Sequence, residues 1–213
     1  MQPIKTSSIT ETALIIEKQA ANCARFIVAI AGAPGSGKST LAVELQAAFS
    51  LISPLLSCQI VPMDGFHFDN KTLIKCQQLK FKGAPYTFDV NAITAFVKQL
   101  KNQKNTLLAP LFNRDLEEVI PSAIPIKVET KIIIVEGNYL LLQQPPWDQL
   151  LSDFDFSLFI QTDKAILEQR LINRWLDQGL NLASAQDKTR QNDLVNGELV
   201  SQFSSTPNII FKQ

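Results

Sequence analysis

The order of hydrophobic and polar residues along the chain predicts strands that alternate with amphipathic helices. The uninterrupted apolar run FIVAIA at 26–31 is typical of a parallel strand that is buried on both faces. Other apolar runs predict strands at 59–63, 106–111, 131–135, 156–160 and 208–211. Strands separated by helical segments indicate an α/β domain whose central sheet is mostly parallel.

Helices are predicted where apolar residues recur at helical spacing. Residues 8–24 show one such pattern, and Ser8 and Glu11 have the spacing of a capping box at its start. Asp89 stands before a second pattern that continues to Leu100, so its carboxylate is expected to cap that helix. Two more helices are predicted over 38–49 and 164–178.

Composition narrows the partners that the chain could have. The 213 residues carry 20 Lys plus Arg and 20 Asp plus Glu, and 46% of them are hydrophobic. This length fits one domain over 1–213, and zero net charge argues against nucleic acid or an anionic membrane as a partner. No secretory signal or membrane span is recognisable, and three Cys without a CxxC pair fit a cytoplasmic location. We therefore expect a small-molecule partner, whereas the sequence does not distinguish a monomer from a homodimer.

A glycine-rich segment at 32–40, GAPGSGKST, matches the phosphate-binding pattern G-x-x-x-x-G-K-[ST] between a predicted strand and a predicted helix. Its glycines allow backbone N–H groups to converge on phosphate oxygens, and the helix N-terminus adds partial positive charge. We expect Lys38 to contact the β- and γ-phosphates of ATP and the Ser39 hydroxyl to hold Mg²⁺. The predicted nucleotide-binding residues are Gly32, Ala33, Pro34, Gly35, Ser36, Gly37, Lys38, Ser39 and Thr40.

Two carboxylates follow other predicted strands. Glu136 ends the run at 131–135, where it could hold Mg²⁺ directly or through water or be an ordinary polar residue at a strand end. Ligands of such sheets bind beyond the carboxyl ends of the strands, so Lys38, Asp64 and Glu136 are expected to converge. Asp64 is a candidate base that takes a proton from an attacking hydroxyl. The alternatives are a second Mg²⁺ ligand and a simple turn residue before Gly65.

Four motifs together resemble a family of small-molecule kinases. They are GAPGSGKST (32–40), MDGFHFDN (63–70), KGAPYTFDV (82–90) and IIIVEGNYLLL (132–142). In this order they resemble the uridine kinase, phosphoribulokinase and pantothenate kinase superfamily, most closely its uridine-kinase-like and sugar-kinase-like branch. The resemblance implies a P-loop NTPase fold, a three-layer sandwich with a lid helix. It also implies phosphoryl transfer from ATP to a hydroxyl of a small molecule.

The same resemblance assigns roles to segments and residues. After the N-terminal helix at 1–24, it implies an acceptor-site segment at 64–88 and a lid and adenine-side region at 164–197. Asp64 would be the base, and Arg170 and Arg174, one helical turn apart, would neutralise the transferring phosphoryl group. A solvated helix face is the alternative for the two arginines. The residues expected to contact the acceptor are His67, Lys82, Tyr86, Arg114 and Asn138.

The chain departs from the family pattern at three positions. Asn113 and Arg114 stand where the family commonly has an acidic or hydroxyl residue and a His, and Arg114 favours an anionic or carbonyl-rich acceptor. Trp175 also replaces a common His. Residues 190–193, RQND, with Asn196 and Gly197, resemble a closing motif near the adenine, although a helix end at Gly197 would explain the glycine equally well.

Two functions remain open at this level. The first is an ATP-dependent kinase that phosphorylates a nucleoside, sugar or pantothenate-like metabolite. The second is a regulatory or assembly P-loop NTPase that uses no small-molecule acceptor. Asp64 and the segment 64–88 favour the kinase, because a nucleotide switch has no need of them.

Overall fold

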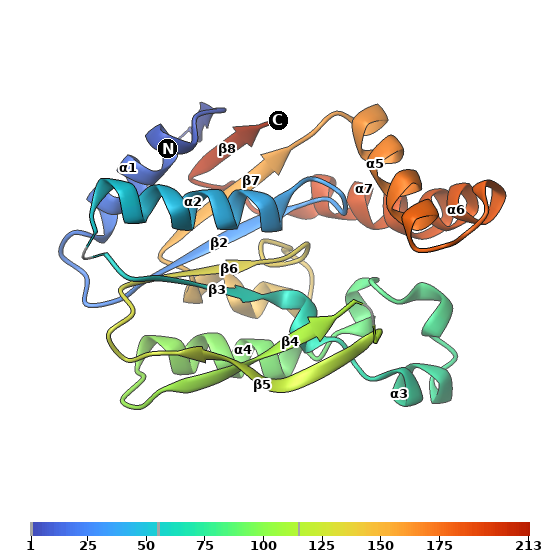
Figure 1. Cartoon of the computed structure of the whole chain (residues 1–213), viewed down its shortest axis with the longest axis horizontal. Coiled ribbons are helices and arrows are strands. Elements are labelled where there is room, and N and C mark those ends of the chain that lie inside the picture. Colours follow the sequence, from blue (N-terminus) through green and yellow to red (C-terminus); the bar gives the residue numbers. More distant parts are fainter. Residues whose placement is uncertain (1, 55, 115) are drawn as a thin grey trace.

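Six parallel strands form the central sheet of the computed structural model, which describes residues 2–54, 56–114 and 116–213. Their order across the sheet is β1-β8-β7-β2-β6-β3 (Figure 1). The strands are β1 (Ile4–Thr6), β2 (Phe26–Gly32), β3 (Cys58–Pro62), β6 (Ile132–Glu136), β7 (Phe156–Gln161) and β8 (Ile209–Lys212). All strands of this sheet that the sequence predicted are found, and β1 is an addition at its edge.

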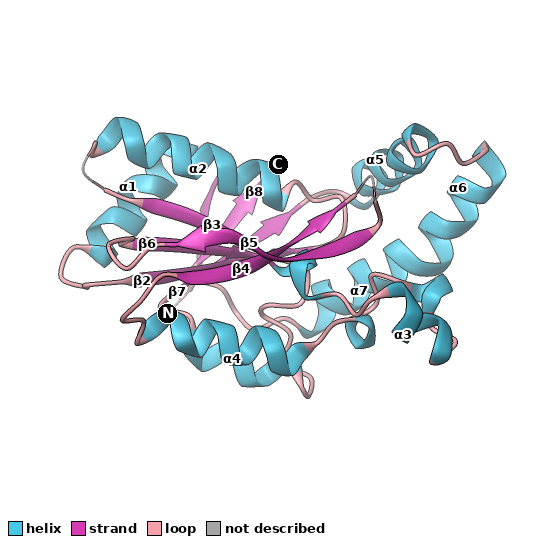
Figure 2. Cartoon of the chain, turned by 60° about the horizontal axis from the view of Figure 1, so that its bottom comes forward, coloured by secondary structure: helices cyan, strands magenta, loops and turns pink. Residues whose placement is uncertain are grey.

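The sheet separates two apolar cores, because successive side chains of a strand point to opposite faces. Val28 and Ile30 of β2 pack with α1 (Ile9–Ala20) and α2 (Lys38–Ile52). Ile27 and Ala29 belong to the opposite core, to which α4 (Val90–Lys101), a 3₁₀ helix (Trp147–Asp153) and α7 (Leu194–Phe203) contribute. Figure 2 shows α2 and α4 on the two sides of the strands. The predicted three-layer α/β sandwich is confirmed.

Helix capping follows the sequence signals. The Ser8 side chain accepts a hydrogen bond from the Glu11 N–H at the start of α1, and Asp89 accepts one from the Ala92 N–H at the start of α4. Both caps were predicted. Helix α1 ends at Ala20 and is shorter than the predicted segment 8–24.

One predicted strand belongs to a different sheet. Residues 106–111 fall on β4 (Leu107–Asn113), which pairs antiparallel with β5 (Glu118–Ile126) in a two-stranded sheet of its own. The sequence missed β5 because it is largely exposed and contains Pro121 and Pro125, so that it lacks an apolar run.

The β4–β5 hairpin lies against the 3₁₀ turn Met63–Phe66 that follows β3. A Cβ atom at Gly65 would lie 2.3 Å from the Pro110 carbonyl oxygen of β4. Only glycine permits this approach of the two backbones. The contact fixes the hairpin beside the carboxyl end of β3.

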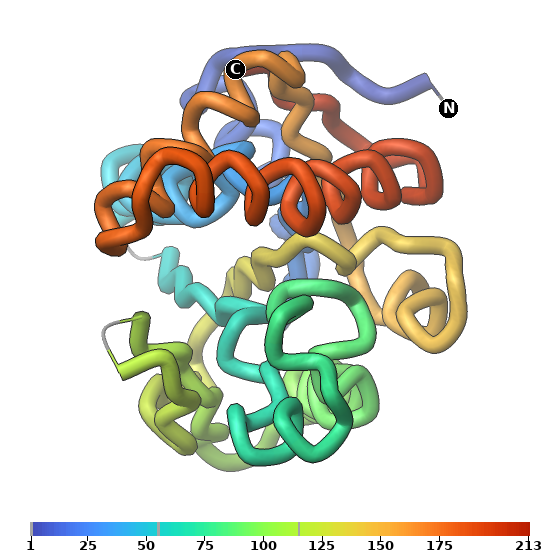
Figure 3. Tube along the Cα trace, turned by 90° about the vertical axis from the view of Figure 1, so that its right-hand side faces the viewer, coloured from blue at the N-terminus to red at the C-terminus, as the bar shows by residue number. Residues whose placement is uncertain are grey.

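Residues 66–88 and the stretch that follows Asp177 contain several short helices. Residues 66–88 contain α3 (Asn70–Lys75) and two 3₁₀ helices, Leu79–Phe81 and Pro85–Thr87. After α5 (Lys164–Asp177) come α6 (Leu182–Lys188), a π-helical turn (Thr189–Asp193) and α7, which form one continuous coil in Figure 3. Gly197 lies inside α7, so the alternative of a helix end there is wrong. No helix in the described residues is long and apolar enough to cross a membrane.

Candidate active site

A cavity of about 240 Å³ lies at the carboxyl ends of the central strands. Its walls come from the P-loop, the turn after β3, the β4–β5 hairpin, the start of the segment after β6, and the helices α5 and α6 with the π-helical turn. The predicted site residues that line it are Pro34, Gly35, Gly37, Lys38, Ser39, Thr40, Asp64, His67, Lys82, Arg114, Glu136, Asn138 and Arg174.

The P-loop places a buried cation at the floor of this cavity. Gly37 has a φ of +83°, in the left-handed region, and forms the N-cap of α2 without a side-chain hydrogen bond. The Lys38 ammonium donates to the Ala33 carbonyl oxygen at 2.9 Å. Burial lowers the pKa of Lys38 to about 8, opposed by the nearby carboxylates of Glu136 and Asp64. The charge of Lys38 is therefore directed into the cavity, where an anion would compensate it.

Ser39 and Glu136 form a hydroxyl–carboxylate pair beside Lys38. The Ser39 Oγ donates to Glu136 Oε1 at 2.9 Å, and burial raises the pKa of Glu136 against the opposing effects of Lys38 and Ser39. The described residues contain no group of three or more metal-binding side chains. Mg²⁺ in phosphate sites takes one or two protein oxygens and completes its shell with phosphate and water, so this oxygen pair fits such an ion.

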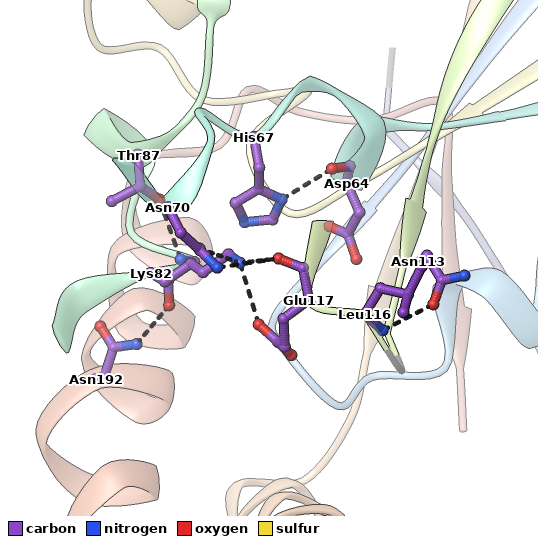
Figure 4. Close-up of polar contacts among 10 residues, drawn as sticks. Asp64, His67, Asn70, Lys82, Thr87, Asn113, Leu116, Glu117 and Asn192 are labelled. Atoms are coloured by element: carbon purple, nitrogen blue, oxygen red, sulfur yellow. Dashed lines mark hydrogen bonds and ion pairs between the residues drawn. The ribbon is translucent and has the colours of Figure 1, made fainter. Parts of the chain in front are cut away.

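Asp64 forms an ion pair across the mouth of the cavity. Its Oδ2 accepts from Nη2 of Arg114 at 3.0 Å, and the two side chains are 33% and 50% exposed. Asp64 comes from the turn after β3, whereas Arg114 follows β4 directly. In Figure 4 the Asp64 carboxylate projects into the space between His67 and Glu117.

His67 packs beside Asp64. Its Nδ1–H donates to the Asp64 carbonyl oxygen at 2.9 Å, and its ring centroid lies 3.8 Å from that of Phe88 and 5.1 Å from that of Phe112. Burial lowers the pKa of His67, although the nearby Asp64 carboxylate opposes the shift. The imidazole is therefore a neutral, oriented group at neutral pH.

Comparisons with known proteins agree with this arrangement. The model of the phosphoribulokinase / uridine kinase family matches residues 27–204. The chain belongs to this family. A protein of Schizosaccharomyces pombe named as a candidate uridine kinase is 31% identical over 196 residues, which are 89% of this chain and 83% of that protein.

Two further proteins that are similar to this kinase are named for different substrates. Pantothenate kinase of Yersinia enterocolitica is 31% identical over 157 residues, or 71% of this chain, and the chain spans only half of its length. The crystal structure of a candidate fructose transport system kinase from Silicibacter sp. TM1040 superposes with a TM-score of 0.90. It is 36% identical and covers 96% of this chain and 98% of its own. The chain is thus a P-loop kinase, and the names of its relatives differ in the acceptor.

Within the kinase cavity, Lys82 has protein partners on its ammonium group. Its Nζ donates to Asn70 Oδ1 at 2.8 Å, to the Glu117 carbonyl oxygen at 2.9 Å and to Glu117 Oε2 at 3.1 Å (Figure 4). The backbone carbonyl of Lys82 accepts from Asn192 at 3.1 Å. Lys82 therefore joins α3, the hairpin and the π-helical turn, in addition to lining the cavity.

Five predicted site residues of the kinase do not line this cavity: Gly32, Ala33 and Ser36 of the P-loop, and Tyr86 and Arg170. Tyr86 is 50% exposed and lines a second, more apolar cavity of about 710 Å³ together with Trp147, because the turn Pro85–Thr87 directs it away from the P-loop. Arg170 is exposed and donates to the Gly35 carbonyl oxygen at 3.4 Å and to Gln213 Oε1 at 3.0 Å. Arg174 therefore lines the cavity and Arg170 does not, although both belong to α5.

Sequence reasoning missed a cluster beside Arg174. The Trp175 indole N–H donates to Asp193 Oδ2 at 2.6 Å, and the Lys188 ammonium lies 3.6 Å from the Trp175 ring centroid. Burial raises the pKa of Asp193, while the Trp175 hydrogen bond and the Arg174 charge oppose the shift. All four residues line the cavity. The only signals for this cluster were the unusual Trp175 and the RQND motif, which we had expected near the adenine.

Because His67 is the single His of the chain, its buried, neutral state can be tested directly. We expect the imidazole of His67 to titrate below about 6.5, the usual value for His, because burial disfavours its charged form. The unfolded chain then binds more protons than the folded chain between the two pKa values, so stability should fall as pH drops through that window. Because the chain contains one His, NMR can follow the titration without assignment. A pKa above 6.5 would contradict the buried, neutral state.

Proposed function

We propose that this kinase transfers the γ-phosphoryl group of ATP to a hydroxyl group of a small metabolite. One observation carries the proposal: the partly exposed carboxylate of Asp64 lies in the same cavity as Lys38 and the Ser39–Glu136 pair. Such a carboxylate is not needed to bind a nucleotide. It is needed to orient a hydroxyl and take its proton.

Each of these side chains of the cavity would have a separate role in such a transfer. Bound ATP supplies the phosphoryl group, and Mg²⁺ supplies positive charge on its phosphate oxygens. Ser39 and Glu136 would hold the ion, and Lys38 of the P-loop and Arg174 of α5 would stabilise negative charge. Asp64 would hold the acceptor hydroxyl and receive its proton. Positioning and charge stabilisation would provide most of the rate enhancement.

The acceptor half of the cavity, the part around Asp64, His67 and Asn138, would bind a small polar molecule. His67 and Asn138 line it and carry groups that can form hydrogen bonds to hydroxyls. The relatives named for uridine, pantothenate and fructose support a nucleoside, sugar or pantothenate-like acceptor without choosing among them. We propose the segment 64–88 as the acceptor segment and 164–197 as the lid of a single kinase domain.

A metabolite screen tests the proposal. The purified chain is incubated with ATP and Mg²⁺ and with nucleosides, sugars, sugar acids, phosphosugars and pantothenate, each separately. ADP and phosphorylated product are then measured by mass spectrometry. We expect one group of related acceptors to give ADP and phosphorylated product in a 1:1 ratio. ATP hydrolysis that only a macromolecule stimulates, with no phosphorylated small molecule, would instead favour a regulatory NTPase.

A further inference from the structure

We infer that Arg114 selects an acceptor with an oxyanion, a carboxylate or a phosphate ester, close to the hydroxyl that receives the phosphoryl group. The inference rests on the proposed function, because it names the substrate class of the same site. It starts from the ion pair between Arg114 and Asp64, two residues that lie 50 positions apart in the sequence.

The fold fixes Arg114 at the reacting end of the acceptor. The close contact between Gly65 and Pro110 brings β4 against the turn that carries Asp64. Arg114 follows β4 directly, so the hairpin brings its guanidinium to Asp64, with Nη2 3.0 Å from Oδ2. A molecule that places a hydroxyl on Asp64 therefore places the substituents of its neighbouring carbon atoms beside Arg114.

Arg114 retains the capacity to bind an additional anion. Nη2 donates to Asp64 Oδ2, and Asp64 is its polar partner among the described residues. A guanidinium has five N–H donors in a planar fork that matches a carboxylate or phosphate, and half of this side chain is exposed. Asp64 likewise keeps its second oxygen for the acceptor hydroxyl. The pair can thus bind a hydroxyl and an oxyanion of the same molecule simultaneously.

The other cations of the cavity have different positions and partners. Lys38 is buried and donates to the P-loop, and Lys82 is bonded to Glu117 and Asn70. Lys188 lies over the Trp175 ring on the lid side, where Arg174 also lines the cavity and is proposed to meet the phosphoryl group. An anionic acceptor at Asp64 would also meet the negative charges of Glu117 and Glu136. Arg114 is the group placed to offset this repulsion, whereas a neutral acceptor would need no such group.

The test compares acceptors of three classes with the wild-type chain and Arg114→Gln. The first class is small hydroxycarboxylic acids, and the second is sugar phosphates. The third is neutral acceptors, namely sugars, polyols and nucleosides, with fructose and uridine included. For the preferred anion, an uncharged analogue such as its amide or methyl ester is also used. We expect the wild type to prefer an anion, and Arg114→Gln to lower kcat/KM for it roughly 10- to 200-fold, mostly through KM. The uncharged analogue should change less than about threefold, and Arg114→Lys should recover part of the loss.

Two controls keep the outcomes distinct. Lys101→Gln removes another partly exposed ion pair, with Asp155, whose members do not line this cavity, and should leave acceptor preference unchanged. Calorimetric binding of the anion without ATP should weaken in Arg114→Gln by the same factor as KM.

Preference for a neutral acceptor, or an equal loss for anion and uncharged analogue, would overturn the inference. If an anion binds through Arg114 and no acceptor is phosphorylated, anion selection holds and the proposed kinase reaction fails; if no anion binds through Arg114, the inference fails.

Discussion

Asp64→Asn is expected to reduce the rate of phosphoryl transfer by roughly 10²- to 10⁴-fold while ATP binding remains unchanged. The amide has almost the shape of the carboxylate but cannot take a proton from the acceptor hydroxyl. It also removes the charge that pairs with Arg114. The P-loop contacts of Lys38 and Ser39 do not involve Asp64, so the nucleotide half of the cavity stays intact. The measurements are kcat with the acceptor found in the screen and calorimetric titration with ATP.

A neighbouring carboxylate supplies the matched control for this variant. Asp69 is exposed, lies outside the cavity and caps α3 by accepting from the Thr72 N–H. Asn is an equally good N-cap residue, so Asp69→Asn should leave both activity and stability nearly unchanged. Full turnover in Asp64→Asn would show that Asp64 is not the base.

Arg174→Ala is expected to lower kcat by roughly 10³-fold or more, the range found for arginines that stabilise a transferring phosphoryl group. Arg174 lines the cavity, and its Nε is buried without a hydrogen-bond partner in the described residues. Burial lowers the pKa of Arg174 and the nearby Arg114 adds to the shift, while Asp193, Asp64 and Glu117 oppose it, so the charge of Arg174 is only partly compensated. Negative charge that develops on the phosphoryl group would provide that compensation.

Arg170→Ala is the matched control, one helical turn away on α5. Arg170 is exposed, and its hydrogen bonds go to the Gly35 carbonyl and Gln213. Its removal should change kcat less than about tenfold, with any effect appearing in the KM for ATP because Gly35 belongs to the P-loop. Equal losses in the two variants would mean that both arginines reach the phosphoryl group when ATP is bound.

The nucleotide half of the site could be predicted from the sequence, because its geometry is local. The pattern GAPGSGKST determines both the turn and the helix start at Lys38, and a strand followed by Glu136 brings that carboxylate to the same sheet edge. Asp64 follows the same rule. These residues converge because parallel strands end together.

The acceptor half could not be predicted fully, because it depends on contacts between distant segments. The Arg114–Asp64 pair requires β5, an exposed strand with two prolines, and the close approach of Gly65 to Pro110. The Trp175–Asp193 hydrogen bond requires a π-helical turn that no local pattern indicates. Tyr86 shows the converse: it belongs to a recognised motif, yet a single turn of backbone directs it into another cavity.

The two-stranded sheet has a consequence for how this enzyme could change its substrate. Lys38, Ser39 and Glu136 stand on or next to the parallel sheet, whereas Arg114 stands on a hairpin that shares no strand with that sheet. Under the proposed function, substitutions of hairpin residues such as Arg114 would alter what meets the acceptor and leave the phosphate-binding framework in place. Evolution and protein engineering can therefore vary the accepted metabolite on one hairpin while the chemistry of ATP is inherited unchanged.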